Sequence, residues 1–218
     1  PSDFAFLWEE CKRCFYLKIR RGFNRPSGPM PAIFNRIDSL MTRYFAEKGT
    51  RDISLELPPG RLEYGQKWVE STPIVVPGYE STCFIRGRFD VVAKFDDGSF
   101  GVIDFKTSQA RPESVRLYGR QLHAYALALE NPAPGRLGLS PITRLGLLCV
   151  EPVDMIRLED QTYAYKAQPT WMECPRDDKS FRSFLGDVLD VLDAPGPPEP
   201  GGRCSYCQYR DAARDLNI

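Results

Sequence analysis

Apolar and polar residues alternate most regularly between positions 86 and 106. Apolar side chains occupy every second position from Phe89 to Phe95, and again at Ile103 and Phe105. A period of two is typical of strands that bury one face. Between the two runs stands Asp96-Asp97-Gly98, which suits a three-residue loop built from a type I turn and a left-handed glycine. The segment is therefore predicted to form a β-hairpin.

The length of this loop sets the register of the hairpin, because a slip of one residue moves every side chain to the other face. With three loop residues, Asp90 lies opposite Asp104 and Val92 opposite Val102, and Lys106 projects on the same face. A two-residue loop would send Asp90 and Asp104 to opposite faces. We expect the three-residue loop, because it gathers the apolar residues on the face away from the aspartates. They are Phe89, Val91, Ala93, Phe95, Ile103 and Phe105.

Two carboxylates that face each other away from bulk water repel, and each favours its protonated form unless a cation lies between them. Mg²⁺ takes one or two protein carboxylates together with waters. Lys106 on the same face is suited to stabilising negative charge on a phosphate. Taken alone, the hairpin equally allows a solvated sheet face with surface ion pairs.

Helical periodicity and terminal signals predict further elements. Ser2 suits the cap of a helix over residues 3–19, whose apolar stripe includes Cys11 and Phe15. The other expected elements are helices over 32–47, 113–130 and 178–192, an inner strand over 144–151, and short strands near 61–64, 74–76, 155–158, 162–167 and 170–174. Residues 194–202 are typical of a stiff linker, and a short polar helix is expected in the tail behind it.

The charge and cysteine content limit the classes of function. The chain has 29 basic and 29 acidic residues, so any nucleic-acid binding has to use a local patch. Four of the seven cysteines form two Cys-x-x-Cys pairs, which favours metal ligation in a reducing compartment such as the cytoplasm over a disulfide framework. No apolar run approaches the length of a membrane span, and no signal-peptide pattern opens the sequence.

A basic patch is expected at the end of the first helix and in the loop behind it. Aromatic residues are interleaved with its members, and no acidic residue stands among them. Such a patch suits a phosphate backbone, although the helix dipole alone also favours basic residues at a helix C-terminus. The patch consists of Lys12, Arg13, Lys18, Arg20, Arg21 and Arg25.

Three short motifs, in chain order, resemble those of the RecB-like branch of the PD-(D/E)XK nuclease superfamily. Gly87-Arg-Phe-Asp90 matches G-x-x-D, Ile103-Asp-Phe-Lys-Thr107 matches (D/E)-x-K, and Gln121-Leu-His-Ala-Tyr125 matches Q-x-x-x-Y. Glu10-Cys-Lys-Arg-Cys-Phe-Tyr16 resembles the family's cysteine-bearing first helix, and Cys204-Ser-Tyr-Cys-Gln-Tyr209 its C-terminal cysteine knuckle. The chain is similar in this respect to the iron–sulfur nucleases of CRISPR spacer acquisition and of the AddB type.

The resemblance implies an α/β fold with a restriction-endonuclease-like core, in which helices flank a mixed β-sheet. It assigns this nuclease core, with the N-terminal cysteine helix, to residues 1–194. Residues 195–218 would be a linker and a cysteine knuckle that packs on the N-terminal helix, so that a four-cysteine metal site joins the chain ends.

The resemblance also implies roles for individual residues. Asp90 and Asp104 would bind the metal, with Phe105 in the same ligand set, and Lys106 would be the catalytic lysine. The Q-x-x-x-Y residues would complete the catalytic set by orienting the DNA and the active site. The expected DNA contacts are Lys12, Arg13, Lys18, Arg20, Arg21, Arg88, Gln121 and Tyr125.

The third metal ligand departs from the family pattern. Relatives usually carry a histidine on the early helix, where this chain has Asp38. A carboxylate suits Mg²⁺ or Mn²⁺ there, and Asn35 is the substitute candidate. His123, the sole histidine, lies inside the Q-x-x-x-Y segment instead.

The cysteine pairs allow more than one cofactor. Iron–sulfur relatives commonly use one N-terminal and three C-terminal cysteines, but Ala212 and Ala213 stand where the third C-terminal cysteine is expected. The resemblance favours a four-iron four-sulfur cluster with Cys14 as the fourth ligand, whereas two Cys-x-x-Cys pairs are more often a zinc site. We favour the cluster, with zinc second and four unligated buried thiols third. The ligands would be Cys11, Cys14, Cys204 and Cys207.

The motifs together predict a Mg²⁺- or Mn²⁺-dependent deoxyribonuclease, either exo- or endonucleolytic. Its relatives act on single strands or duplex ends in DNA repair, recombination or phage and CRISPR-type defence. The resemblance therefore implies that this chain works with a larger repair or defence complex. The alternative is a catalytically inactive relative that binds DNA or acts as a scaffold, as the missing histidine would allow. A zinc-stapled protein-interaction module explains the cysteines but gives the hairpin carboxylates no purpose.

Overall fold

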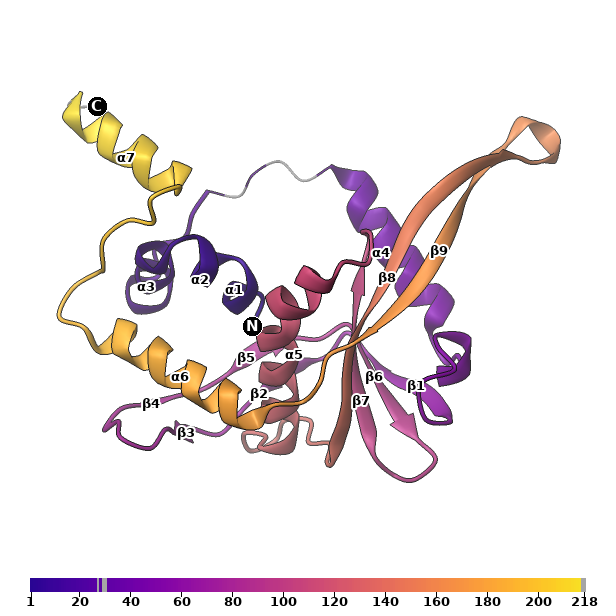
Figure 1. Cartoon of the computed structure of the whole chain (residues 1–218), viewed down its shortest axis with the longest axis horizontal. Coiled ribbons are helices and arrows are strands. Elements are labelled where there is room, and N and C mark those ends of the chain that lie inside the picture. The colour runs from indigo at the N-terminus through magenta and orange to yellow at the C-terminus, as the bar shows by residue number, and fades with distance from the viewer. Residues whose placement is uncertain (27, 29–30, 217–218) are drawn as a thin grey trace.

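A five-stranded mixed sheet lies at the centre of the structure, a computed structural model that describes residues 1–26, 28 and 31–216 (Figure 1). Neighbouring strands run antiparallel except for β7 and β8, which are parallel and are connected through helix α5 (Pro112–Glu130). The strand order is β1 (Gly60–Gly65), β6 (Val91–Phe95), β7 (Phe100–Lys106), β8 (Ile142–Arg157) and β9 (Tyr163–Glu173). The predicted α/β class with a mixed sheet is thus confirmed.

The β6–β7 hairpin has the predicted register. Val92 lies opposite Val102, and the Phe95 N–H donates to the Ser99 carbonyl at 2.8 Å, which leaves three residues in the loop. Gly98 in that loop has φ +84°, a left-handed conformation that glycine adopts without strain. Continuing the same register places Asp90 opposite Asp104.

Both faces of the hairpin are buried. Val92 and Val102 pack into a core with α5 and α6 (Asp178–Asp193), while the opposite face packs into a second core beneath α4 (Ala32–Phe45). One expected position is wrong: Phe89 belongs to the first core, because the chain bends at Asp90 between β5 (Arg86–Arg88) and β6. The second core contains Val91, Ala93, Phe95, Ile103 and Phe105 as predicted.

The predicted first helix over 3–19 is wrong as a single element. The chain forms α1 (Ser2–Ala5), α2 (Leu7–Glu10) and α3 (Lys12–Arg21), and Ser2 lies inside α1 without acting as a side-chain cap. The second break falls at Cys11, whose backbone is extended (φ −161°, ψ 103°). Its Sγ accepts a hydrogen bond from the Gly201 N–H at 3.3 Å. Contact with the C-terminal segment thus accompanies the interruption of the helix.

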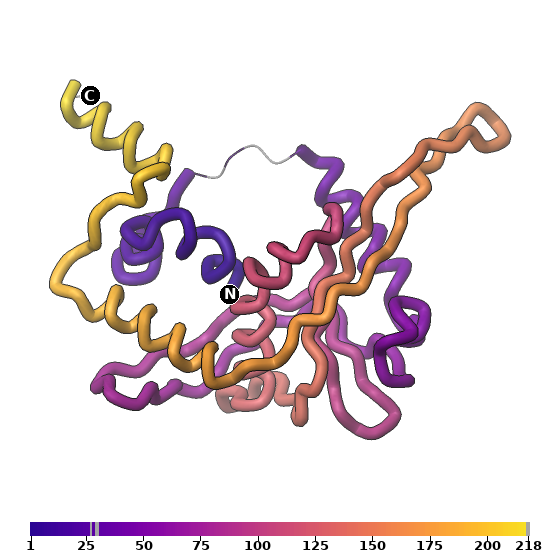
Figure 2. The backbone as a smooth tube through the Cα atoms, viewed as in Figure 1, coloured from indigo at the N-terminus to yellow at the C-terminus, as the bar shows by residue number. Residues whose placement is uncertain are grey.

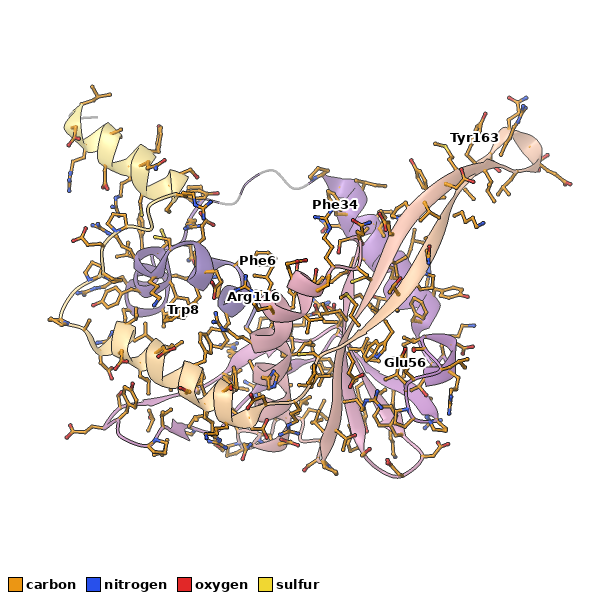
Figure 3. All side chains as sticks on the ribbon, in the orientation of Figure 1. Phe6, Trp8, Phe34, Glu56, Arg116 and Tyr163 are labelled. Atoms are coloured by element: carbon orange, nitrogen blue, oxygen red, sulfur yellow. The ribbon has the colours of Figure 1, made fainter. Side chains whose placement is uncertain are left out.

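Strands β8 and β9 continue past the sheet as a bare two-stranded ribbon (Figure 2). The three short strands expected over 155–174 are therefore parts of two long ones. Tyr163, near the far end of this ribbon, is 63% exposed (Figure 3). Large apolar side chains of the ribbon lie in solvent, among them Val153, Met155, Ile156, Leu158 and Tyr165.

Several short elements complete the fold. Two small antiparallel pairs flank the sheet, and the predicted tail helix is α7 (Ser205–Asp215). Among the described residues, no helix has both the length and the apolar character that crossing a membrane demands. The short elements are β2 (Trp68–Glu70) paired with β5, β3 (Ile74–Val75) paired with β4 (Thr82–Cys83), and single 3-10 turns at Thr50–Asp52 and Glu159–Gln161.

Candidate functional site

The carboxylates of the hairpin meet at the C-terminal end of β7. Asp104 lies on this strand with only 2% of its surface exposed, so the alternative of a solvated face does not hold. Asp90 sits at the bend before β6, and its Oδ2 accepts a hydrogen bond from the Phe105 N–H at 2.8 Å. The strand pairing and this hydrogen bond bring the two aspartates together. The buried side chain of Phe105 faces the second core, so only its backbone borders the site.

The two oxygens of Asp104 have different partners. Oδ1 accepts a hydrogen bond from Gln121 Nε2 on α5 at 3.0 Å. Oδ2 forms a close ion pair with Lys106 Nζ and has no other polar partner within the described part of the chain. The Lys106 ammonium also lies over the Tyr118 ring, 4.2 Å from its centroid. The carboxylate and the lysine are thus held in fixed positions by α5.

The electrostatics of the pair call for a cation. Burial, and next the charge of Asp104, raise the pKa of Asp90 to about 7 from its usual 3.8, against the opposing effects of the Phe105 N–H and Lys106. Burial lowers the pKa of Lys106, but the charge of Asp104, the hydrogen bond to its carboxylate and the charges of Tyr118 and Asp90 together raise it by more. Two carboxylates with one buried oxygen that accepts no hydrogen bond fit a hard divalent ion such as Mg²⁺ or Mn²⁺.

The Q-x-x-x-Y residues face the protein. The Tyr125 hydroxyl donates to the Arg88 carbonyl at 2.6 Å, and Gln121 Nε2 lies 3.4 Å from the same hydroxyl. Burial, and then the charges of Asp104 and Asp90, raise the pKa of Tyr125, so it stays a neutral donor. Both side chains are buried. These contacts fit the expected role of orienting the active site and leave neither side chain exposed for the expected contact with DNA.

The candidates for the third ligand lie on α4. Asp38 is half-buried, and its charge contributes to the raised pKa of Asp90, whereas Asn35 is exposed one helical turn earlier. Asp38 is nevertheless not clustered with the other two carboxylates. Within the described ranges, the ligand atoms of three or more cysteine, histidine or acidic residues converge only at the four paired cysteines.

His123 contributes to the packing of the fold and is not a candidate ligand. Its Nδ1 lies 2.7 Å from the Gly119 carbonyl, and its Nε2 accepts a hydrogen bond from the Asp177 N–H at 2.8 Å. The ring also stacks on Phe181. The histidine therefore joins α5 to the start of α6.

The four paired cysteines converge across almost the whole length of the chain. All four are buried, and their sulfurs lie within 4.8 Å of one another. Cys14 Sγ lies 3.7 Å from Cys204 Sγ and 3.6 Å from Cys207 Sγ, and Cys11 Sγ lies 3.8 Å from Cys207 Sγ. A tetrahedral zinc ion with Zn–S bonds of about 2.3 Å holds its sulfurs about 3.8 Å apart. A cubane cluster binds each thiolate to a separate iron and therefore spaces the sulfurs more widely.

The cysteine environment also fits a metal ion. Burial raises the pKa of Cys14 and of Cys207, so neither thiol ionises readily without a cation. Burial acts in the same direction on Cys11, but the hydrogen bonds it accepts, the first from the Gly201 N–H, lower its pKa to about 6. Four buried sulfurs at metal-ligand spacing therefore fit a bound cation better than free thiols.

Sequence reasoning missed a partner of this centre. Arg25 Nη2 donates to Cys204 Sγ at 3.1 Å, and the guanidinium lies over the Tyr206 ring, 4.7 Å from its centroid. The same side chain forms an ion pair with Glu10 at 2.7 Å. Arg25 was assigned to the basic patch, and no local pattern connects it to a cysteine 179 positions away.

The basic patch is less free than predicted. Lys18 pairs with Asp3 at 2.8 Å, and Lys12 lies over the Trp8 ring, so acidic and aromatic partners come from earlier in the chain. Arg20 and Arg21 are exposed at the end of α3. These two are the members best placed for a phosphate backbone.

Comparison with known proteins identifies one family. The family model described as the PD-(D/E)XK nuclease superfamily matches residues 25–212. No curated protein matches the sequence. Among solved structures, the chain is similar to the crystal structure of SSO0001, with 16% identity and a TM-score of 0.44. The match covers 83% of this chain but 66% of SSO0001, just under two thirds of its length.

Proposed function

Because the chain belongs to the PD-(D/E)XK nuclease superfamily, we propose that it is a metal-dependent nuclease that hydrolyses phosphodiester bonds in DNA. One observation carries the proposal: the buried Asp104 and the half-buried Asp90 are held together beside Lys106, and burial and the charge of Asp104 raise the pKa of Asp90 to about 7. A cation bound between the two carboxylates would keep Asp90 charged. We also propose the RecB-like branch, on the strength of the three motifs and their order.

The residues of the site would have three different roles in phosphodiester hydrolysis. A divalent ion held by Asp90 and Asp104 would supply Lewis-acid chemistry at the scissile phosphate. Lys106, held by Asp104 and the Tyr118 ring, presents a positive charge where negative charge develops in the transition state. Arg88, exposed next to the site, is suited to holding a neighbouring phosphate.

The proposed substrate is single-stranded DNA or the ends of duplex DNA, in repair, recombination or defence. The test is incubation of the purified protein with end-labelled single-stranded, double-stranded and circular DNA in Mn²⁺ or in EDTA. Cleavage in Mn²⁺ alone supports the nuclease, and the product ladder distinguishes exo- from endonucleolytic cutting. Cleavage that persists in EDTA would refute the metal dependence.

One observation favours the alternative of an inactive DNA-binding subunit. Lys106 already neutralises Asp104, and Asp38 is not clustered with the aspartates, so the site lacks a compact three-ligand set. DNA binding by gel shift together with no cleavage in either metal would support this alternative over the nuclease.

For the four-cysteine centre we propose zinc ahead of the iron–sulfur cluster. Three sulfur pairs at 3.6–3.8 Å, with all four sulfurs within 4.8 Å of one another, support a single tetrahedral ion, whereas the family resemblance supports the cluster. An absorption spectrum and metal analysis of anaerobically purified protein distinguish them. Zinc gives a colourless protein with one metal ion per chain, and a cluster gives a brown protein containing iron and sulfide.

Asp38→Ala is expected to weaken metal-dependent cleavage far more than Asn35→Ala. Asp38 is half-buried near Asp90, and a carboxylate is the stronger ligand for a hard ion, while Asn35 is exposed. The measurement is the initial cleavage rate of both variants across a Mn²⁺ titration. Equal rates, or a larger loss in the Asn35 variant, would remove Asp38 from the ligand set.

The affinity for Mn²⁺ is expected to fall about tenfold for each pH unit below 7. The raised pKa of about 7 means that Asp90 retains a proton below that pH, and a bound cation has to displace it. Above pH 7 the affinity should level off. Isothermal titration calorimetry with Mn²⁺ from about pH 5.5 to about pH 8 measures this, and a flat profile would contradict it.

A further inference from the structure

Gln66 lies directly behind β1, where the chain turns toward β2, and it has an unusual backbone. Its φ is +41°, in the left-handed region that residues with side chains seldom adopt. Glycine would occupy this position more readily.

Gln66 contacts two elements of the candidate active site, the bend at Asp90 and helix α4. Its backbone N–H donates to the Asp90 carbonyl at 2.7 Å, which fixes the bend that carries Asp90. Its side-chain Oε1 accepts a short hydrogen bond from Arg88 Nη2, two residues before Asp90. Its Nε2 donates to Thr42 Oγ1 on α4 at 3.3 Å.

Thr42 connects this amide to the proposed third ligand. Residues four apart on a helix lie on the same side, so Thr42 shares the side of α4 that carries Asp38. The Gln66 amide therefore ties the helix segment bearing Asp38 to the strand end bearing Asp90. Few other polar contacts of the described residues do this: Thr107 Oγ1 lies 3.8 Å from Met41 Sδ, which is a weak interaction.

We propose that Gln66 is a positioning residue that sets the separation between Asp38 and Asp90 and holds Arg88 at the edge of the site. This inference rests on the proposed function, because it concerns the same metal site. Gln66 touches neither substrate nor metal. It acts by fixing α4 against the hairpin, as residues behind the ligands of a metal site commonly do.

Gln66→Gly tests the proposal without destabilising the fold. Glycine loses the two side-chain hydrogen bonds but relieves the left-handed backbone, so the two effects on stability oppose each other and the melting temperature should change little. The Mn²⁺ dissociation constant, measured by calorimetry on the full chain, is expected to rise roughly 10- to 100-fold. Thr42→Val, which keeps the shape of the side chain and removes the hydroxyl, should change the Mn²⁺ affinity in the same direction.

Gln161→Gly is the matched control. Gln161 also has a left-handed backbone (φ +59°), but it lies exposed at the tip of the ribbon. Its substitution should leave Mn²⁺ affinity unchanged. Unchanged affinity in both Gln66→Gly and Thr42→Val would overturn the inference. Asp104→Asn is the reference: if the parent binds Mn²⁺ no better than this variant, the proposed metal site fails, and the positioning role fails with it.

Discussion

Asp104→Asn is expected to reduce Mg²⁺- or Mn²⁺-dependent DNA cleavage by roughly 10³-fold or more while the protein stays folded. The amide has the shape of the carboxylate, and its oxygen can still accept the hydrogen bond from Gln121 Nε2. What it lacks is the negative charge that binds the cation and pairs with Lys106. The measurement is the single-turnover cleavage rate of labelled DNA, with the melting temperature recorded for each variant.

Asp96→Asn is the control for this change. Asp96 lies in the loop of the same hairpin and is exposed. Among the described residues its one hydrogen bond runs from its backbone N–H to the Pro59 carbonyl. Its cleavage rate should equal that of the parent. Undiminished cleavage by Asp104→Asn would remove this residue from the site, and so would equal losses in the two variants.

Lys106→Met should lower the cleavage rate without lowering the affinity for the metal. The Lys106 side chain is 19% exposed, and methionine can fill its place over the Tyr118 ring. Removing the ammonium also frees Asp104 Oδ2, so Mn²⁺ binding should stay equal or become tighter. A variant that loses Mn²⁺ binding and cleavage together would show that Lys106 supports the fold of the site and not the reaction.

The local sequence was sufficient to predict the hairpin and its register. The Asp96-Asp97-Gly98 loop fixes which residues pair, and the observed pairs follow that count. It was not sufficient to predict that both faces are buried, since a period of two is the same whether the polar face meets water or a helix. The side chain of Gln121, 17 positions away in sequence, packs over Asp104 and donates a hydrogen bond to it.

The errors have a common physical cause. Phe89 was placed by continuing the alternation of β6, but the chain bends at Asp90 and the alternation restarts on the other side. Cys11 was placed in a helix by its apolar stripe, yet its backbone is extended where its sulfur meets Cys207 and the Gly201 N–H. In both cases a contact between distant segments overrides local periodicity, which no local pattern records.

Gln66 and Arg25 show the same limit for functional residues. Each side chain forms hydrogen bonds with a site built from distant parts of the chain. Gln66 contacts Thr42 and Arg88, and Arg25 contacts Cys204. Neither stands in a recognisable motif. Residues that support a site only through long-range contacts are therefore found from the structure, whereas ligands with fixed spacing are found from the sequence.

Cys207→Ser is expected to release the metal of the four-cysteine centre and to lower the melting temperature by about 10 °C. Cys207 is 2% exposed, and its sulfur lies 3.6 Å from that of Cys14 and 3.8 Å from that of Cys11. A serine hydroxyl is a poor ligand, and it would be left buried among thiols without a good hydrogen-bond partner. If the four cysteines bind a metal as proposed, its binding free energy stabilises the folded chain, and the variant would lose that contribution.

Cys207→Ser should loosen the C-terminal tail in addition to lowering the stability of the whole chain. Residues 194–202 form no helix or strand, and α7 beyond them is mostly exposed, so the cysteines are the main attachment of the tail. Limited proteolysis of Cys207→Ser with trypsin should therefore cut after Arg203, at the end of this segment, faster than in the parent. Chelation of the metal in the parent should reproduce this pattern, and cleavage of DNA should be lost mainly through the lower stability.

Cys174→Ser separates loss of a ligand from loss of a buried thiol. Cys174 is 4% exposed, and its sulfur is not part of the four-cysteine group. Its substitution should lower the melting temperature modestly but leave the metal content and the tryptic cleavage after Arg203 unchanged. If Cys207→Ser retains its metal and resists proteolysis as the parent does, the four sulfurs do not form a metal centre. If both variants lose the same stability with no change in metal, the cysteines are ordinary buried thiols.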